Sequence, residues 1–347
     1  MSQLPSNLFC SIKQLIENSK KSIVRNINTT MLLTYFQIGK VIVENEQDGR
    51  DRAEYAKETL KNLSHQLTRE FGRGYSVDSL QWMRKFYLMY QNRIAEKYET
   101  VFRNSAKGSN YESTSRNSFF SLSWSHYIQL MKIENPDERN FYEIEASQNN
   151  WSVRELIRQF NSAIYERLAL TRDVKGVKEL AQKGQIIEKS TDVLKSHYVL
   201  EFLDLKEDNH YSESDLETEI INKLEHFMLE LGKGFLFEGR QRRFTFEGDS
   251  FFVDLVFYNR LLRCFVLLDL KIGKLSHQDI GQMQMYVNYY DRKVKLAEEN
   301  PTIGIILCKE ENKTVIEFTL PENNNTIFAK EYKAILPTKE ELKKQVR

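Results

Sequence analysis

The chain has 347 residues, and its 50 Lys and Arg side chains nearly balance 49 Asp and Glu, which gives a formal net charge of +1. This balance excludes a protein that binds nucleic acid through an overall positive charge, so any nucleic-acid surface has to be a local patch. The length favours two domains over one.

The cysteines are three in number, Cys10, Cys264 and Cys308, and they lack the spacing of metal ligands. Scattered, odd-numbered cysteines are typical of a reducing compartment. The N-terminus has no signal-peptide pattern, and no apolar run approaches the ~18 residues that a membrane span requires. We therefore expect a soluble, cytoplasmic protein with no membrane partner.

Residues 8–170 carry apolar side chains at helical spacing almost throughout, which predicts an all-α N-terminal region. A helix is expected over 54–70, and Gly72 and Gly74 then favour a tight turn. Ser76 can cap the helix that follows. A helix, a glycine turn and a capped helix form the outline of a helix-turn-helix.

The same segment has a local excess of positive charge. Between residues 61 and 97 there are seven Lys or Arg and three acids, a difference of 7 − 3 = +4. Arg84 and Lys85 lie within it, and such a patch can bind phosphates without reading sequence. The alternative is a pair of ordinary packed helices with a solvated basic face.

The expected domain boundary follows a polar, basic stretch at 171–187, which we interpret as a connector. Composition thus predicts a helical domain for DNA binding or assembly over 1–170, a linker over 171–190 and a second domain over 191–340. No internal repeat is visible.

The second domain is expected to begin with an amphipathic helix over 213–231, capped by Ser214 and ended by Gly232. Glu217 lies at the edge of its apolar stripe, so its carboxylate can face the core. The alternative is that Glu217 completes a capping box with Ser214.

Apolar and aromatic runs then predict strands near 235–246, 251–258 and 263–271, a helix over 279–291, and a buried parallel strand at 302–308. Two further runs, VIEFTL at 315–320 and IFAKEY at 327–332, are expected to add strands. The predicted fold class is a two-domain α/β (α+β) protein, with the order αβββαβ in its second domain.

Charged residues interrupt two of these strands, where burial makes charge costly. Asp254 lies within FFVDLVFY, and Asp269 and Lys271 end CFVLLDLK. Because side chains alternate along a strand, Asp269 and Lys271 point to the same side. Unpaired buried carboxylates cost several kcal/mol (order of magnitude), so they are usually paired or bound to metal. The alternative is a turn cap at Asp254 with a surface ion pair at Asp269 and Lys271.

This arrangement resembles the PD-(D/E)XK nuclease superfamily, in which a hairpin presents two acids to Mg²⁺ and a lysine assists the attacking water. The resemblance implies that Asp254 and Asp269 hold Mg²⁺, with Mn²⁺ as a substitute, and that Lys271 activates water. It also implies that Glu217 is an accessory acid. Carboxylates are the ligands that Mg²⁺ prefers.

A second motif lies on the helix after the lysine strand. Gln282 and Tyr286 are four residues apart, so they share one face of that helix. A Gln-x-x-x-Tyr motif there resembles the branch of the superfamily that contains the RecB-type nucleases, and it implies that Gln282 orients substrate or lysine. The alternative for Tyr286 is a role in the core.

Longer stretches resemble the YhcG family, whose helical N-terminal domain precedes a PD-(D/E)XK domain. They include LSHQLTREFGRGYSVDSLQWMRKFY at 63–87, WSVRELIRQFNSAIYERL at 151–168 and FFVDLVFYNRLLRCFVLLDLKIGKLS at 251–276. Two residues depart from the family pattern. Asp269 stands where the family more often has Glu, and Asn259 stands where a His is common.

The expected function is Mg²⁺-dependent hydrolysis of phosphodiester bonds in DNA, in bacterial restriction, defence, recombination or repair. Gln241 and Arg243, in the strand before Asp254, are candidates for nucleic-acid contacts together with Tyr286. We expect a homodimer formed through the N-terminal domain and partners among restriction-modification or repair proteins. Two alternatives stay open: a non-catalytic DNA-binding or assembly subunit, and a nuclease that cleaves RNA.

Overall fold

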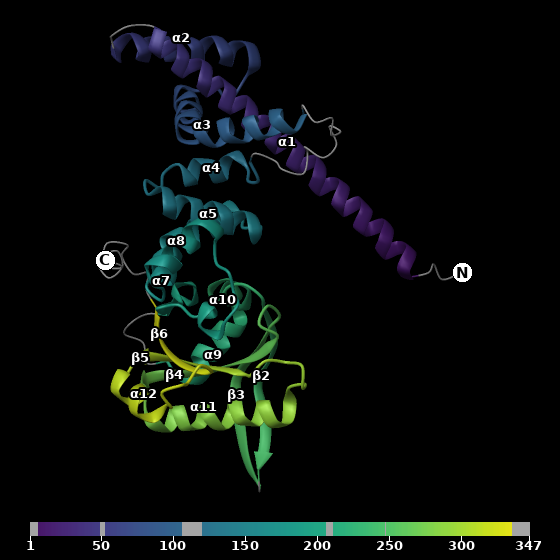
Figure 1. Cartoon of the computed structure of the whole chain (residues 1–347), viewed down its shortest axis with the longest axis vertical. Helices are drawn as coiled ribbons and strands as arrows, with labels where there is room; N and C mark the ends of the chain where they lie inside the picture. Colours follow the sequence, from purple (N-terminus) through teal and green to yellow (C-terminus); the bar gives the residue numbers. More distant parts are fainter. Residues whose placement is uncertain (1–5, 49–52, 106–119, 206–210, 247, 335–347) are drawn as a thin grey trace. The chain divides into compact units, whose positions relative to one another are not determined.

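The structure is a computed structural model that describes residues 6–48, 53–105, 120–205, 211–246 and 248–334. It divides into two compact units (Figure 1). One comprises Met1–Arg139 and Ala146–Val153, and the other comprises Asn140–Glu145 and Arg154–Arg347. Packing therefore divides the chain earlier than residues 171–190, where composition led us to expect the linker. No helix in the described part is long and apolar enough to span a membrane.

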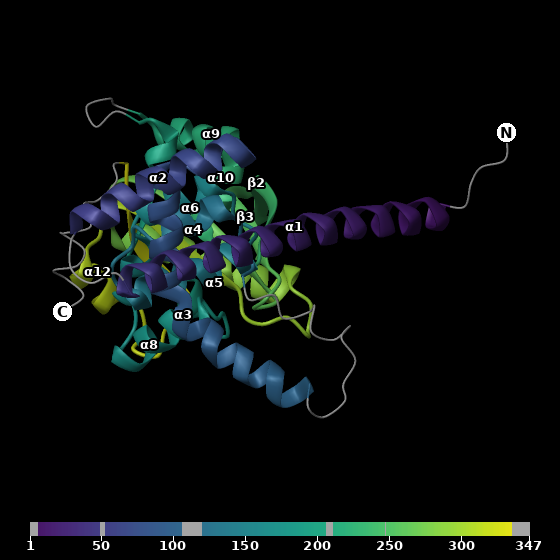
Figure 2. The ribbon, with the colours of Figure 1, turned by 90° about the horizontal axis from the view of Figure 1, so that it is seen from above.

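The first unit is helical, as the sequence predicts. Its helices are α1 (Ser6–Asp48), α2 (Ala53–Phe71), α3 (Val77–Ser105), α4 (Trp124–Leu130) and part of α5 (Pro136–Gln148). α1 is a single helix of 43 residues, the long purple ribbon of Figure 2. The predicted turn joins α2 to α3, with positive φ angles at Gly72 and Gly74. Ser76 caps α3, because its Oγ accepts a hydrogen bond from the Ser79 amide at 3.2 Å.

Close packing of α1 against α3 builds the core of this unit. Leu80 and Met83 of α3 are buried against Ile42 of α1 and Leu60 of α2. Gly39 permits the close approach, since a Cβ atom there would lie 2.1 Å from the Met83 carbonyl oxygen. Any larger residue at position 39 would separate the two helices.

Besides residues 140–145 of α5, the second unit contains α6 (Val153–Asn161), α7 (Ile164–Ala169) and α8 (Val174–Lys183). α8 lies within 171–187, the stretch that we interpret as a connector, so this stretch contains a helix. The Asp173 side chain caps this helix by accepting from the Gly176 amide at 2.8 Å, and Gly184 follows its last residue. The cap and the buried Leu180 stabilise this helix, which the polar composition of the segment does not predict.

The expected helix 213–231 is two helices, α9 (Glu213–Asn222) and α10 (Leu224–Leu231), which meet at Lys223. Its predicted cap is also wrong. Ser212, not Ser214, caps α9 and forms a capping box with Asp215. Glu217 takes no part in that capping box, so its carboxylate is available elsewhere.

In the part of the chain that the structure describes, six strands form one mixed sheet: β1 (His197–Val199), β2 (Phe235–Phe246), β3 (Asp249–Asn259), β4 (Cys264–Lys274), β5 (Ile303–Glu310) and β6 (Ile327–Lys333). Their spatial order is β1-β6-β5-β4-β3-β2. The pairs among β2, β3 and β4 are antiparallel, whereas β4, β5, β6 and β1 run parallel. The central parallel place of β5 confirms the prediction.

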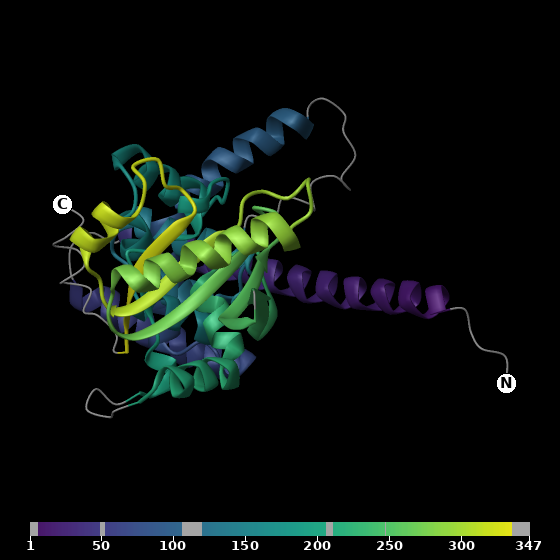
Figure 3. The same cartoon turned by 90° about the horizontal axis from the view of Figure 1, so that it is seen from below.

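Helices cover both faces of this sheet. α11 (His277–Tyr289) connects β4 to β5 and lies along one face (Figure 3). The other core contains residues of α9 and α10. The strand expected at 315–320 is wrong, because this segment belongs to α12 (Lys313–Thr319). A helix is suited to this place, since parallel β5 and β6 need a crossover connection.

The β2–β3 hairpin continues past the point where the sheet ends. β3 pairs with β4 only from Leu255 to Asn259, whereas its residues from Asp249 to Val253 pair with β2 alone. Residues 242–246 and 249–253 therefore form a two-stranded ribbon, which extends past α11 in the view of Figure 1. We call it the β2–β3 ribbon.

Candidate active site

Asp254 and Asp269 lie next to each other on neighbouring strands. Each is one residue beyond the pair that Leu255 of β3 makes with Leu268 of β4, at the point where these strands stop pairing. The Leu270 amide donates a hydrogen bond of 2.8 Å to Asp254 Oδ2. The hairpin therefore brings together two carboxylates that are fifteen residues apart in the sequence.

Lys271 faces the same side of β4 as Asp269, as strand alternation predicts. Its Nζ lies 2.8 Å from Asp269 Oδ2 and 3.6 Å from the Glu213 carboxylate at the start of α9. Asp269 is 2% exposed and Lys271 is half-buried, so water screens their interaction poorly. The contribution of Glu213 was not predicted from the sequence.

Burial and charge change the proton affinities of this pair. Burial, and secondly the charge of Asp254, raise the pKa of Asp269 to about 7, although Lys271 opposes the shift. Burial lowers the pKa of Lys271, but the Asp269 carboxylate outweighs burial and holds that pKa above its usual value. The site thus stabilises a positive charge beside two carboxylates.

Glu217 joins this group from α9. Its side chain is buried, and burial raises its pKa. The Gln241 amide nitrogen donates to Glu217 Oε2 at 2.5 Å and to Asp254 Oδ1 at 3.2 Å. Arg240 Nε lies 3.4 Å from Glu217 Oε1. We call Asp254, Asp269 and Glu217 the acidic group. Gln241, a candidate for nucleic-acid contacts, thus lies against two of its members.

The Gln-x-x-x-Tyr pair lies on α11, facing the sheet. Gln282 donates a hydrogen bond from its amide to the Tyr286 hydroxyl. Tyr286 is 1% exposed and packs edge-on against Phe244, so it is a core residue. Burial raises the pKa of Tyr286 to about 12, with smaller effects of Asp269 and Asp254. These effects indicate that its hydroxyl also lies within electrostatic reach of the acidic group.

The remaining predicted nucleic-acid residues belong to other elements of the chain. Arg243 belongs to the β2–β3 ribbon, where its Nε donates to Ser250 Oγ at 3.1 Å. Arg84 and Lys85 belong to the first unit. Arg84 Nε forms an ion pair of 2.7 Å with Glu46, and Lys85 Nζ lies 5.4 Å from the Trp82 ring centroid.

Asn259, which stands where a His is common in the YhcG family, has a structural role. Its side chain is fully buried, donates to the Lys233 carbonyl at 3.0 Å, and accepts from the amides of Leu261 and Leu262. An Asn that bonds to its own turn is a common way to close a hairpin. Asn259 thus closes the turn between β3 and β4.

The acidic group fits a hard divalent cation, although its acids are few. Among the residues that the structure describes, no three His, Cys, Asp or Glu side chains converge in the manner of a preformed metal site. However, Asp269 Oδ2 and Glu217 Oε1 are buried, and a cationic side chain lies beside each of them: Lys271 Nζ at 2.8 Å and Arg240 Nε at 3.4 Å. The site therefore already attracts positive charge. Mg²⁺ commonly uses one or two carboxylates and completes its shell with water and phosphate.

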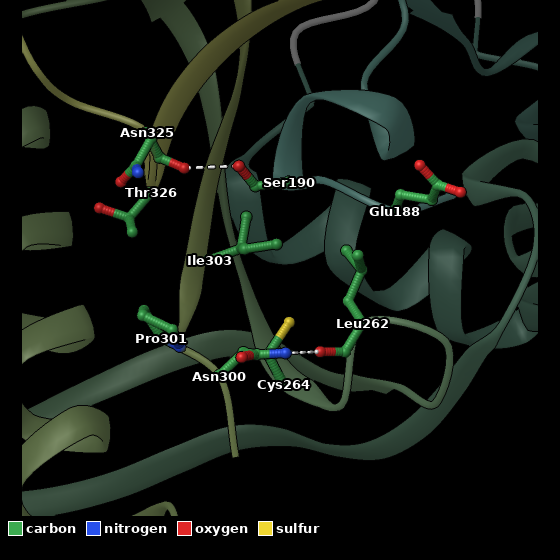
Figure 4. Close-up of a pocket in the computed structure, with 9 residues that line it drawn as sticks. All are labelled: Glu188, Ser190, Leu262, Cys264, Asn300, Pro301, Ile303, Asn325 and Thr326. Carbon is green, nitrogen blue, oxygen red and sulfur yellow. Dashed lines mark hydrogen bonds between the residues drawn. The ribbon is translucent and has the colours of Figure 1, made fainter. Parts of the chain in front are cut away.

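A pocket of about 200 Å³ lies elsewhere in the second unit (Figure 4). It is lined at the beginning of β4 and β5, by Leu262, Cys264 and Ile303 among others, and Ser190 closes one side with a hydrogen bond of 2.6 Å to the Asn325 carbonyl. Asp269 and Lys271 lie further along β4. The pocket therefore has no part in the acidic group.

A mixed sheet whose β3–β4 hairpin carries Asp254, Asp269 and Lys271, between helices on both faces, is a PD-(D/E)XK nuclease domain. A family model described as the YhcG PDDEXK nuclease domain matches residues 191–347, and the DUF1016 N-terminal domain matches residues 11–167. The chain is 39% identical over 346 residues to the "Putative nuclease YhcG" of Escherichia coli (strain K12), covering 95% of this chain and 90% of that protein. It belongs to the YhcG family.

Two solved structures show weaker similarity. One is a repair endonuclease from Pyrococcus abyssi, with 17% identity, a TM-score of 0.26, and coverage of 38% of this chain and 50% of that one. The other is the EndoMS-dsDNA2 complex, with 12% identity, a TM-score of 0.27, and coverage of 39% and 51%. This chain thus matches about half the length of each.

Proposed function

We propose that the protein is a Mg²⁺-dependent nuclease that hydrolyses phosphodiester bonds in DNA, with Mn²⁺ as a substitute. The observation that carries this proposal is the buried Asp269, with Asp254 beside it and Lys271 Nζ at 2.8 Å from its carboxylate. A structural ion pair needs only one acid, whereas two acids and a lysine suit phosphate chemistry.

Asp254 and Asp269 would hold the cation, together with the main-chain carbonyl after Asp269. When bound, the cation supplies charge stabilisation at the phosphate and acidifies water. Lys271 keeps its proton because of Asp269, so it donates hydrogen bonds and orients the attacking water or the scissile phosphate. Glu217 is the accessory acid, and Gln282 orients substrate through its place beside Tyr286.

We further propose that DNA lies along the β2–β3 ribbon. A two-stranded ribbon fits the major groove of a duplex. This ribbon leads directly to Asp254 and presents the exposed Arg243, which forms a hydrogen bond to Ser250, together with Phe246 and Phe252, which are 40% and 43% exposed. Bound there, the duplex would have its backbone beside the acidic group.

The test is incubation of the pure protein with linear, nicked, branched and single-stranded DNA and with RNA, with and without Mg²⁺. Cleavage of DNA that EDTA abolishes supports the proposal. Cleavage of RNA alone would change the substrate but keep the chemistry. Binding without cleavage of any of them would favour a non-catalytic subunit of a restriction or repair complex.

The basic segment of the first unit gives a prediction about binding. Replacing Arg84 and Lys85 with alanine should weaken DNA binding about equally for all sequences and lower the salt slope by ~1–2 units, because phosphate contacts are lost. We expect a decrease of about 1 unit, because Arg84 is already paired with Glu46 and Lys85 then makes the main phosphate contact. Filter binding between low and high salt measures the slope.

A matched control is available on α8, where Lys175 and Lys178 are exposed. Replacing both with alanine removes the same charge and should leave the slope unchanged. Equal slopes for the Arg84/Lys85 variant and the wild type would place the DNA surface elsewhere, and the N-terminal unit would then serve to dock a protein.

We also propose a homodimer formed through residues 1–170. Large apolar residues follow one another along the N-terminal half of α1 and are 47–66% exposed, including Ile12, Leu15, Ile16, Ile23 and Ile27. Light scattering of the full chain at tens of micromolar should give twice the monomer mass. Replacing Ile16 and Ile23 with glutamate should give monomers, whereas Phe318→Glu, on the 82%-exposed Phe318 of α12, should not. A wild-type monomer would contradict the proposal.

Two further expectations concern the cell. Cys264 and Cys308 are buried free thiols, which supports a reducing, cytoplasmic location. Partners among restriction-modification or repair proteins follow from the proposed activity on DNA.

A further inference from the structure

The backbone of β2 is irregular at one residue. Gln241 has a φ of 47°, in the left-handed region, although it lies inside a strand. Its neighbours Arg240 and Arg242 pair regularly with Leu255 and Val253 of β3, so Gln241 faces the part of β3 that contains Asp254. A residue with a Cβ atom holds this conformation only where the surroundings enforce it, and such positions cluster at functional sites.

This backbone conformation places the Gln241 side chain between two acids, and its amide forms one hydrogen bond to each; we call this pair of hydrogen bonds the fork. The Gln241 amide nitrogen lies 2.5 Å from Glu217 Oε2 and 3.2 Å from Asp254 Oδ1. An amide nitrogen has two N–H donors, one for each acid, and it carries no charge that would neutralise either of them. Asp254 is thereby held at both oxygens, since the Leu270 amide donates to Oδ2.

We propose that Gln241 is a positioning residue of the cation site, which places Glu217 of α9 beside Asp254 of β3 and so makes Glu217 a third acid of that site. This inference depends on the proposed function, because it assigns Gln241 a role in binding the cation. Gln241 acts through the two acids and need not touch the cation.

Competing influences on Glu217 are weaker. Arg240 and Gln241 are both exposed, but Arg240 reaches the other oxygen of Glu217 only at 3.4 Å, a longer contact than the 2.5 Å hydrogen bond of Gln241. Ser212 and Asp215 cap α9 without it. The Gln241 hydrogen bond is thus the short contact that fixes the direction of the Glu217 carboxylate.

The test measures cation affinity by melting the full chain in a titration of Mg²⁺ and of Mn²⁺. The variants are Gln241→Met, which keeps the length of the side chain but removes both donors, Glu217→Gln, and the double variant. Gln241→Met should weaken the apparent affinity about 10–100-fold, the usual effect of losing a residue that orients metal ligands. Because part of the effect of Gln241 passes through Glu217, the double variant should lose less affinity than the sum of the two single losses.

Two glycine variants separate the effect of the backbone conformation of Gln241 from the effect of its side-chain amide. Arg263, in the turn between β3 and β4, has a φ of 50° and an exposed side chain, so Arg263→Gly relieves a similar conformation away from the acids. Without cation, relief of the left-handed conformation should raise the melting temperature of Arg263→Gly. In Gln241→Gly the loss of the donor to the buried Glu217 carboxylate opposes this gain. Only Gln241→Gly should lose cation affinity, because only it removes the fork.

The outcomes are distinguishable. Wild-type affinity in Gln241→Met, or losses that simply add in the double variant, would overturn the positioning role while leaving the cation site in place. A wild-type protein whose melting ignores both cations would overturn the cation site of the proposed function, and the role of Gln241 with it.

Discussion

Replacing Asp254 with asparagine is expected to abolish both DNA cleavage and the rise in melting temperature that Mg²⁺ or Mn²⁺ produces. Without a cation, Asp254 and the buried Asp269 repel each other. Burial raises the pKa of Asp269, and the charge of Asp254 raises this pKa further. A cation that binds the folded state stabilises it by RT ln(1 + [M]/Kd), or ~1.4 kcal/mol at tenfold over Kd. The variant loses a ligand, so this gain should vanish.

Lys271→Ala should separate catalysis from cation binding. Cleavage should fall by at least ~100-fold, in the range of residues that assist proton transfer or orient the nucleophile. Cation binding should persist or tighten, because a positive charge 2.8 Å from Asp269 is removed. Single-turnover cleavage and cation titrations of melting temperature measure the two effects separately.

Matched controls lie on the same strands. Asp249 of β3 is exposed in the β2–β3 ribbon, and Lys274 of β4 forms an exposed pair with Glu310 at 3.0 Å. Asp249→Asn and Lys274→Ala should leave cation-dependent melting unchanged. If Asp254→Asn and Lys271→Ala instead destabilise the protein alike, and cations have no effect on the wild type, the set is a structural ion pair and not a nuclease site.

The second large effect is expected at a buried ionic cluster of the second unit. Arg167 of α7, Glu230 of α10 and Lys195 are all fully buried. Arg167 bonds directly to the Glu230 carboxylate, to the Ser162 carbonyl at 2.8 Å and to the His197 carbonyl at 3.1 Å. The cluster thus fastens α7 to α10 and to the segment that contains β1.

Removing one member should be costly, because its partner stays behind as a buried charge. Burial raises the pKa of Glu230, but Arg167 and Lys195 outweigh burial and lower it to about 2, so Glu230 is ionised at neutral pH. Arg167→Met should destabilise the second unit by about 3–5 kcal/mol, the usual effect of breaking a buried pair. In a unit of this size that lowers the melting temperature by roughly 6–20 °C.

Calorimetry of the full chain measures this effect and can resolve the two units as separate transitions. The control is Lys183→Met on α8, whose pair with Glu179 at 3.9 Å is more than half exposed and should matter by less than about 1 kcal/mol. A small effect of Arg167→Met would show that α7 is only loosely attached, and that the second unit begins after it.

Much of the acidic group follows from the sequence because its parts are local. The β3–β4 hairpin is encoded by two apolar runs with a turn between them, and strand alternation alone puts Asp269 and Lys271 on one side. Helical periodicity predicts that Glu217 lies on the side of its helix that faces the core, and its side chain is buried there. The turn between α2 and α3 was equally local, since Gly72 and Gly74 supply its left-handed conformations.

Only the tertiary structure decided the features that depend on distant partners. The segment 313–319 is a helix and not a strand because β5 and β6 run parallel and need a crossover. Arg167 and Glu230 are 63 residues apart, so no local pattern pairs them. Gln241 adopts its left-handed backbone where an acid from α9 and an acid from β3 both meet its amide, and the sequence places these three residues on separate elements. Periodicity determines which way a side chain points, whereas long-range packing determines what it meets there.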